Sequence, residues 1–541
     1  MARGKGQGKD WPADKLAEAH AHYAAAIVYE MEENTQAALE EYYQAALNDP
    51  DNEALILEVS RRLLQQKQPE KALAVVSAAA ARPRATGAIF ARLGMIDAQL
   101  GKNEQAAAAN RAAIKRSPDS LAGYQNLVLL ALQKKQSPEA LKVLEAAGRQ
   151  PKADADFLVG LAELCASVAL QSPSEKEKLD AQALAALKRA DKLNPAGMQL
   201  RLRLADSFAA LGETGRAAAL YLDLVKKLPD VPFIRERVHA KLASIYLRGS
   251  DNKKAIEQFE AVIRDDPTNP QAYFYLGRLY YEAKDSAHAA DCFSKTIVLN
   301  PGAEEAYCYL ALSQIGINQS QEALATLDKA RQKFPQDFDV ELITALAYTR
   351  QKAYPQAIRH YTAAEVIAKA TEPARLNQEF YFEIGAAYER TGDYTQAEDY
   401  FQKCLQLAPD FSEALNYLGY MWAEHGVKLD RARGLIQKAL QKEPQNPAYL
   451  DSLGWVLFKL KQPQDALGYI LKAVQLSKDP DPTVLDHLGD IYAALDQPQK
   501  AREAWTKSLT LEANEQVRRK LEVVPPAPGQ APNPKSPEQH E

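Results

Sequence analysis

A period of 34 residues runs through most of this 541-residue chain and constrains its fold more than any other feature. The segments 270–303 and 378–411 carry the same residue types at the same places: an aromatic residue, an apolar residue followed by glycine, then tyrosine, alanine, phenylalanine and proline. A unit of this length cannot bury its apolar face alone, so it must stack on its neighbours. We therefore expect one extended repeat array instead of the three or four globular domains that the length alone would suggest.

Carrying this phase along the chain predicts fourteen repeats, which begin at residues 19, 53, 87, 121, 155, 198, 236, 270, 304, 338, 378, 412, 447 and 482. The strongest regularity is an alanine in the second half of every repeat: Ala38, Ala72, Ala106, Ala140, Ala183, Ala217, Ala255, Ala289, Ala323, Ala357, Ala397, Ala432, Ala466 and Ala501. A second small residue lies in the first half of each repeat; it is glycine in six repeats, alanine or serine in seven, and valine (Val128) in the fourth.

These two small positions predict a pair of antiparallel helices in each repeat. Where the two helices cross, a side chain larger than a methyl group would push the axes beyond the usual 8–10 Å. A proline ends nine of the repeats and stops the second helix: Pro50, Pro118, Pro195, Pro229, Pro267, Pro301, Pro335, Pro409 and Pro444. The alternative is an ordinary helical bundle, which has no reason to keep one period fourteen times.

The spacing of the large and small residues resembles that of the tetratricopeptide repeat. Segment 270–303 matches its pattern at Tyr273, Leu276-Gly277, Tyr280, Ala289, Phe293 and Pro301, with tyrosine in place of the first tryptophan. This resemblance implies an all-α fold, a right-handed α-solenoid of about fourteen helix-turn-helix units.

The period also divides the chain into segments. We expect a flexible basic leader at 1–18, repeats 1–6 at 19–231, repeats 7–10 at 236–371, repeats 11–14 at 378–515, a polar capping helix at 514–522 and a disordered proline-rich tail at 523–541. Extra residues interrupt the period near 171–178, at 229–232 and at 370–377. Tolerated surface insertions are the simpler interpretation of these interruptions, and functional loops are the alternative.

Composition and motifs argue against several classes of function. The formal net charge of −5 does not favour nucleic-acid binding. No apolar run approaches the ~18 residues of a membrane span, and the first ten residues lack the apolar core of a secretion signal. The sequence as given therefore predicts a cytoplasmic protein; a periplasmic or lipid-anchored one is the alternative if a signal segment is missing.

We find no sign of catalytic or metal chemistry in the sequence. The array leaves no stretch for a separate catalytic domain, the glycine-rich start lacks the spacing of a phosphate loop, and the histidines show no metal-ligand spacing. The four cysteines (Cys165, Cys292, Cys308 and Cys404) lie in apolar helical patterns and are expected to be buried thiols. The sequence thus predicts a protein that is not an enzyme and holds no cofactor or metal.

The expected binding surface is the concave side of the array. The resemblance implies that first helices line this side and that positions 2, 5, 9, 12 and 13 of each repeat look into it. By helical periodicity, positions 5, 9 and 12 form a stripe beside the packing stripe, and in repeats 8–13 this stripe is unexpectedly apolar. The candidate partner-binding residues are Phe274, Arg278, Tyr281, Leu312, Phe382, Asn416, Tyr420, Trp455 and Phe458.

Trp455 and Phe458 are the sharpest candidates, because they are one helical turn apart beside the packing stripe. As binding residues they could be truncated with little loss of stability. The alternative for these aromatics is packing between neighbouring repeats, in which case truncation would lower the stability.

A more specific resemblance lies near the C-terminus, in segments 415–432 (LNYLGYMWAEHGVKLDRA) and 447–455 (PAYLDSLGW). These look like long bacterial cell-envelope tetratricopeptide proteins, which include lipoprotein adaptors of carboxyl-terminal processing proteases; the lipobox cysteine of such lipoproteins is absent here. We predict a non-enzymatic scaffold or adaptor that binds proteins or peptides, with a protease or another envelope enzyme among the partners that the resemblance implies. The alternative is a sensor whose solenoid changes shape when it binds a peptide or small molecule.

Overall fold

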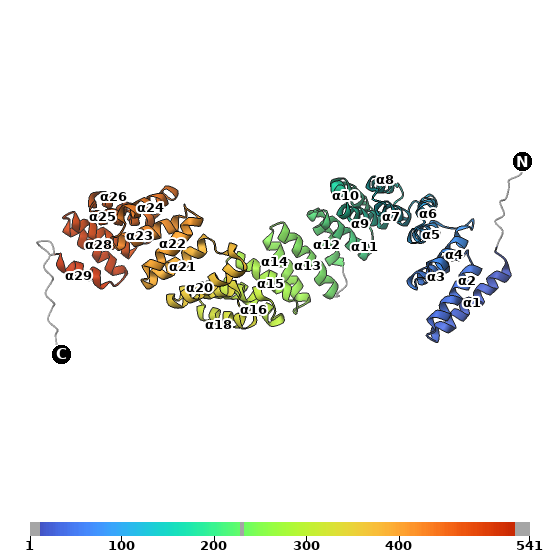
Figure 1. Cartoon of the computed structure of the whole chain (residues 1–541), viewed down its shortest axis with the longest axis horizontal. Helices are drawn as coiled ribbons and strands as arrows, with labels where there is room; N and C mark the ends of the chain where they lie inside the picture. Colours follow the sequence, from blue (N-terminus) through green and yellow to red (C-terminus); the bar gives the residue numbers. More distant parts are fainter. Residues whose placement is uncertain (1–10, 228–231, 525–541) are drawn as a thin grey trace. The chain divides into compact units, whose positions relative to one another are not determined.

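The computed structural model describes residues 11–227 and 232–524, and the chain forms two compact units, Met1–Pro267 and Thr268–Glu541. The described residues contain twenty-nine α-helices and two short 3-10 turns, and the helices come in antiparallel pairs (Figure 1). This is the predicted all-α solenoid of about fourteen helix-turn-helix units.

The first unit contains α1 (Ala13–Met31), α2 (Thr35–Asn48), α3 (Glu53–Gln65), α4 (Pro69–Ala80), α5 (Gly87–Gln99), α6 (Asn103–Arg116), α7 (Leu121–Gln133), α8 (Ser137–Gly148), α9 (Ala155–Gln171), the 3-10 turn η1 (Pro173–Glu175), α10 (Lys176–Lys192), α11 (Met198–Ala210), α12 (Thr214–Lys227), α13 (Pro232–Arg248) and α14 (Asn252–Asp265).

The second unit contains α15 (Pro270–Glu282), α16 (Ser286–Leu299), α17 (Glu304–Gly316), α18 (Ser320–Lys333), α19 (Phe338–Arg350), α20 (Tyr354–Thr371), the 3-10 turn η2 (Pro373–Arg375), α21 (Gln378–Thr391), α22 (Tyr394–Leu407), α23 (Ser412–Glu424), α24 (Leu429–Lys442), α25 (Pro447–Lys459), α26 (Pro463–Leu476), α27 (Pro482–Ala494), α28 (Pro498–Leu511) and α29 (Glu515–Val523).

Twelve of the fourteen first helices begin at the residue that the period predicts. The exceptions are α13, which begins four residues early, and α1, which begins at Ala13 instead of residue 19. The expected leader at 1–18 is therefore too long, because the helix-forming residues after Pro12 extend α1 backwards. Residues 1–10, Pro229 and the tail beyond residue 524 lie outside the described residues, and the grouping of the repeats into three segments stays a prediction.

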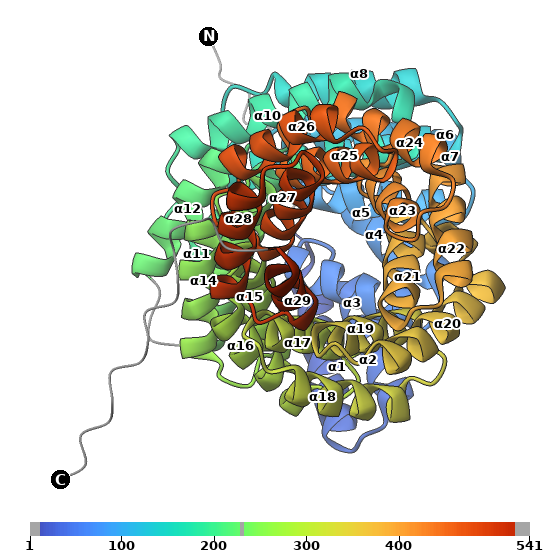
Figure 2. The same ribbon diagram turned by 90° about the vertical axis from the view of Figure 1, so that its left-hand side faces the viewer.

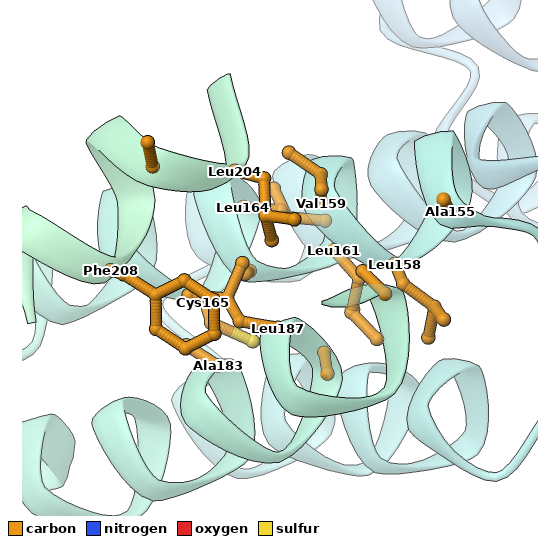
Figure 3. Packing of buried hydrophobic residues seen from close by; sticks show 14 of the residues in the cluster. Ala155, Leu158, Val159, Leu161, Leu164, Cys165, Ala183, Leu187, Leu204 and Phe208 are labelled. Atoms are coloured by element: carbon orange, nitrogen blue, oxygen red, sulfur yellow. The ribbon is translucent and has the colours of Figure 1, made fainter. Parts of the chain in front are cut away.

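The core is organised around the two small positions of each repeat. All fourteen second-helix alanines are buried, and so is the small residue of each first helix. In the first unit the space around the crossing is filled by larger side chains; Figure 3 shows Cys165, Leu187 and Phe208 packed side by side between α9, α10 and α11. Three of the four cysteines are buried, as predicted, whereas Cys308 is half-buried.

A left-handed residue joins the two helices in thirteen of the repeats. These residues are Glu33, Lys67, Gly101, Lys135, Gly212, Ser250, Lys284, Asn318, Lys352, Gly392, Gly426, Lys461 and Asp496. After Lys461 (φ 63°), for example, the N–H of Gln462 donates to the carbonyl of Leu457 at 2.9 Å, which closes the end of α25. Only four of the thirteen are glycine, so the sequence pattern does not reveal this turn.

First and second helices occupy different sides of the second unit. Figure 2 shows α21, α23, α25 and α27 on the inner side of the curve that this unit follows, with α22, α24, α26 and α28 outside them. The first helices therefore carry the concave surface, as the repeat pattern implies.

We predict that Gly454→Ala lowers the free energy of unfolding by about 1–3 kcal/mol, because the core at this crossing has no room for a methyl group. A Cβ atom at Gly454 would lie 2.5 Å from Cγ1 of Ile470 and 3.2 Å from the carbonyl oxygen of Ala466. Gly468→Ala on α26 is the matched control, since a Cβ there meets nothing within 4 Å and should stabilise the helix by up to ~1 kcal/mol. Denaturant unfolding followed by circular dichroism measures both; equal stability of the two variants would contradict the assigned crossing.

Candidate partner-binding site

One candidate site in the second unit is an open pocket of about 580 Å³ on repeats 9 and 10. Its lining comes from α17, from α19 and from the turn after α20: Glu304, Glu305, Cys308, Tyr309, Leu312, Asp337, Asp339, Ile343, Glu372 and Arg375. Five carboxyl groups and one guanidinium thus surround a floor of apolar and aromatic side chains. We call this site the acidic pocket.

Local sequence places each of these carboxyl groups. Glu304 and Glu305 occupy the first turn of α17, where acidic side chains favour the positive end of the helix dipole. Asp337 is the N-cap of α19 and accepts a hydrogen bond from the N–H of Val340 at 2.7 Å. The insertion at 370–377 lengthens α20 and adds η2, which brings Glu372 and Arg375 to the pocket wall.

The negative charge of the acidic pocket is only partly balanced. Arg375 pairs with Asp339, with 3.0 Å between Nη1 and Oδ2, and its guanidinium lies 4.3 Å from the ring centre of Phe338. Among the described residues, Glu304, Glu305, Glu372 and Asp337 have no ion-pair partner. Burial and the neighbouring charges of Asp337 and Asp339 raise the pKa of Glu304. The pocket therefore favours a cationic ligand.

The floor of the pocket gives it apolar contact surface but no nucleophile. Burial, together with the charges of Asp337 and Asp339, raises the pKa of the Cys308 thiol to about 12, so Cys308 stays protonated at neutral pH. In the part of the chain that the structure describes, no three His, Cys, Asp or Glu side chains are placed to hold a metal ion. The arrangement fits recognition of a basic group next to an apolar one.

A second, smaller pocket of about 350 Å³ adjoins the acidic pocket and shares Glu304 and Glu305 with it. Phe274 of α15 lines this second pocket, and Leu312 lines the first. The two together form a continuous surface over repeats 8–10.

Tyr309 organises the candidate residues at this end of the predicted stripe. Its ring centre lies 6.1 Å from that of Phe274 and 5.5 Å from that of Tyr281, and the guanidinium of Arg278 is 5.9 Å from it. The structure thus brings Phe274, Arg278 and Tyr281 together around a residue that sequence reasoning missed, and Tyr309 also lines the acidic pocket.

The candidates in repeats 11–13 lie in more tightly packed surroundings. Phe382 packs among Phe401, Phe411 and Tyr417, with ring centres 5.2–5.9 Å apart. Asn416 is buried, and its Oδ1 has no hydrogen-bond partner among the residues that the structure describes. Tyr420 is half-buried, with its ring centre 6.2 Å from that of His487.

Trp455 differs most from its expected role as an accessible binding residue. It is only 6% exposed and belongs to the core of repeats 11–14. Its indole stacks on His487 and on Phe458, with ring centres 3.9 and 5.1 Å apart, and its Nε1 donates to Glu424 at 2.7 Å. This burial favours the alternative for Trp455, packing between neighbouring repeats; Phe458 is half-buried, and the effect of truncating either residue stays a prediction. The physical reason for the burial of Trp455 is that α25 packs directly against α23.

An ion pair lies beneath Trp455. Nδ1 of His487 is 2.9 Å from Oδ1 of Asp451, and the two residues are 4% and 6% exposed. Burial by itself would lower the pKa of His487. The charge and hydrogen bond of Asp451, together with the charges of Asp486 and Glu424, outweigh burial, so the pKa of His487 is raised. The pair connects α25 to α27.

The sequence contained partial signals for the residues that were missed. Glu305 and Asp339 occupy position 2 of their repeats, which the repeat pattern assigns to the concave face. The interruption at 370–377, interpreted as a tolerated insertion, supplies two residues of the pocket wall. The predicted stripe was identified by its apolar character, so it does not contain the carboxyl groups that distinguish this pocket.

Comparisons with known proteins agree with this architecture. A model of the tetratricopeptide repeat matches residues 181–232, 240–304, 310–374 and 427–482, and a second model of the same repeat matches residues 379–411; together they span half of the chain. None of the curated proteins matches the sequence. In the described ranges, no helix has the length and apolar character to cross a membrane.

Solved structures similar to this chain include a chain of the APC/C hetero-tetramer Cut9–Hcn1, which is 18% identical, with 85% of this chain and 94% of that chain covered and a TM-score of 0.39. A tetratricopeptide repeat protein from Parabacteroides merdae is 17% identical, with 47% and 97% covered and a TM-score of 0.38. YrrB, described as a tetratricopeptide protein with an unusual peptide-binding site, is 21% identical, with 35% and 95% covered and a TM-score of 0.31.

We predict that Trp455→Ala lowers the free energy of unfolding by about 3–5 kcal/mol, because truncation leaves a cavity between α23, α25 and α27. The truncation also removes the indole that stacks on His487 of the His487–Asp451 pair. Leu471→Ala on the outer helix α26 is the control: Leu471 is 42% exposed, and its truncation should change stability by no more than ~0.5 kcal/mol. Denaturant unfolding compares the two variants. If the Trp455→Ala protein is as stable as the control, the packing role of Trp455 is contradicted and its role as a binding residue is supported.

We also predict that the His487–Asp451 pair stabilises the protein more at low pH than at high pH. A histidine whose folded-state pKa is raised contributes its full stability below its unfolded pKa of about 6.5, and this contribution is lost as the pH rises through the folded-state pKa. The stability advantage of wild type over His487→Gln should therefore shrink between pH 6 and pH 9 in denaturant titrations. Leu471→Ala, which removes no titratable group, is the control. A pH-independent advantage of wild type over His487→Gln would show that the raised pKa is wrong.

Proposed function

Because the chain belongs to the tetratricopeptide repeat family, whose members typically mediate protein–protein interactions, we propose that it is a non-enzymatic adaptor that binds a basic segment of a partner protein in the acidic pocket. The observation that carries this proposal is the unbalanced charge of that pocket: five carboxyl groups face one arginine around an apolar floor. A peptide that alternates lysine or arginine with apolar residues complements both features.

The shape of the surface supports a peptide in preference to a single small cation. The acidic pocket continues into the smaller pocket at Phe274, so several side chains of one segment have places to bind. Tyr309 and Leu312 offer apolar contact next to the carboxyl groups of Glu304 and Glu305. Aromatic and apolar anchors with a charged rim are typical of peptide-binding hot spots.

A narrower version of the proposal concerns the class of partner. The resemblance of 415–432 and 447–455 to lipoprotein adaptors supports a carboxyl-terminal processing protease, or another envelope enzyme, as the protein that the adaptor serves. Both segments lie in the tightly packed α23–α25 region, so this version rests on the resemblance and does not depend on the acidic pocket. Affinity purification from the native host, with mass spectrometry of the captured proteins, tests it.

The proposal predicts that a fluorescein-labelled peptide of alternating lysine and leucine binds the full chain, whereas the same peptide with glutamate for lysine does not. Glu305→Lys combined with Glu372→Lys should weaken binding at least tenfold, because it replaces two negative charges on the pocket wall by two positive ones. The matched control is Glu503→Lys, an exposed glutamate on the outer helix α28, which should leave the affinity unchanged. Fluorescence anisotropy measures each affinity.

The pH dependence of binding gives an independent check. Since the pKa of Glu304 is raised, this carboxyl group takes up a proton earlier than an ordinary glutamate as the pH falls, and the affinity for the lysine peptide should fall with it. Equal binding of the two peptides, or full binding by the double variant, would overturn the proposed role of the acidic pocket.

A further inference from the structure

Repeat 3, in the first unit, departs from the array at two positions that face each other. Position 11 of the first helix is aromatic in eight other repeats: Tyr29, Phe208, Tyr246, Tyr280, Tyr348, Tyr388, Trp422 and Tyr492. It is leucine in two more, Leu63 and Leu457, and the remaining three repeats hold Ala131, Cys165 and Gln314. In repeat 3 the same position holds Asp97 on α5.

Two other repeats show a ring pair that fills this place. In repeat 10, Tyr348 stacks on His360 of the second helix, with ring centres 5.5 Å apart; in repeat 11, Tyr388 stacks on Tyr400 at the same distance. The residue of repeat 3 that corresponds to His360 and Tyr400 is Ala109. Both members of the ring pair are thus replaced by small side chains.

An open pocket of about 510 Å³ takes the place of the missing rings. It lies over α4, α5 and α6 and is lined by Leu73, Ser77, Phe90, Leu93, Asp97, Lys102, Gln105, Ala108, Ala109 and Ala112. This volume is within the range of small-ligand sites, and the lining is mainly apolar. We call it the Asp97 pocket.

Asp97 is the unusual member of this lining. It is only 5% exposed, and its carboxyl group makes no hydrogen bond or ion pair with any residue that the structure describes. Lys102 lines the same pocket but forms no ion pair with Asp97. Burial raises the pKa of Asp97, and the charge of Lys102 offsets this rise only in part, so the carboxylate lacks a close counter-ion.

We propose that the Asp97 pocket binds an organic cation, an ammonium or guanidinium group carried on an apolar stem. The cation would pair with the carboxylate of Asp97, and the stem would pack on Leu73, Phe90 and Leu93 in the space that the ring pair fills in repeats 10 and 11. Such a group is either a free amine or guanidine compound or a basic side chain of a bound peptide. The site lies in the first unit and does not depend on the proposed role of the acidic pocket.

Isothermal titration calorimetry with the full chain tests the proposal, in the Glu305→Lys/Glu372→Lys background so that the acidic pocket does not bind the probes. One arm compares phenethylammonium with neutral phenethyl alcohol. The other compares acetyl-Leu-Lys-Leu-amide with the same peptide carrying norleucine for lysine. We expect the charged member of at least one pair to bind at least tenfold more tightly than its neutral counterpart; binding in the first arm identifies a free-cation site, and binding in the second alone identifies a peptide site.

Three variants connect binding to this pocket. Asp97→Asn keeps the shape and should abolish the preference for the charged probe. Lys102→Gln removes a competing cation from the lining and should strengthen binding severalfold. Asp97→Tyr restores the aromatic residue of the other repeats and should raise the melting temperature while abolishing binding, because the ring fills the pocket.

Clear results would overturn the proposal. If the parent chain binds neither charged probe better than its neutral counterpart, the pocket is not a cation site, whatever the melting temperature of Asp97→Tyr. If Asp97→Asn, folded by circular dichroism, binds the charged probe as tightly as the parent, the probe is bound elsewhere.

Discussion

The close crossing of two helices in every repeat is the constraint on which the rest of this structure depends. All fourteen second-helix alanines are buried at that crossing, opposite a small residue of the first helix. Because the backbones approach closely there, the larger side chains are forced to the sides, where they pack against the neighbouring repeats. Stability therefore accumulates from one interface to the next along each unit.

Sites arise where a repeat departs from this packing pattern. In repeat 10 the departure is an insertion, and it brings Glu372 and Arg375 beside the acidic first turn of α17. In repeat 3 the departure is at two positions, where Asp97 and Ala109 stand in place of the ring pair of repeats 10 and 11. Both departures leave a charged group next to an apolar surface.

Buried polar groups have a different role in repeats 12–14. The His487–Asp451 ion pair, the indole of Trp455 and the carboxylate of Glu424 connect α23, α25 and α27 through stacking and hydrogen bonds. These groups satisfy one another, so they hold the helices in register instead of presenting a surface to a partner. The same residue types that predicted a binding stripe thus stabilise the C-terminal end of the array.

The sequence by itself determined the architecture, because the same local pattern occurs in every repeat. This pattern predicts the helix pairs, twelve of the fourteen first-helix starts and the buried small positions. It also predicted a stripe that contains Phe274 and Leu312, and in the structure these two side chains line pockets. Only the tertiary structure decided which part of the predicted stripe is open, because the direct packing of α23 on α25 buries Trp455 whereas Leu312 keeps contact with an open pocket. The acidic pocket and the Asp97 pocket were likewise beyond the sequence, since each is made by side chains from three helical elements whose distances the period does not specify.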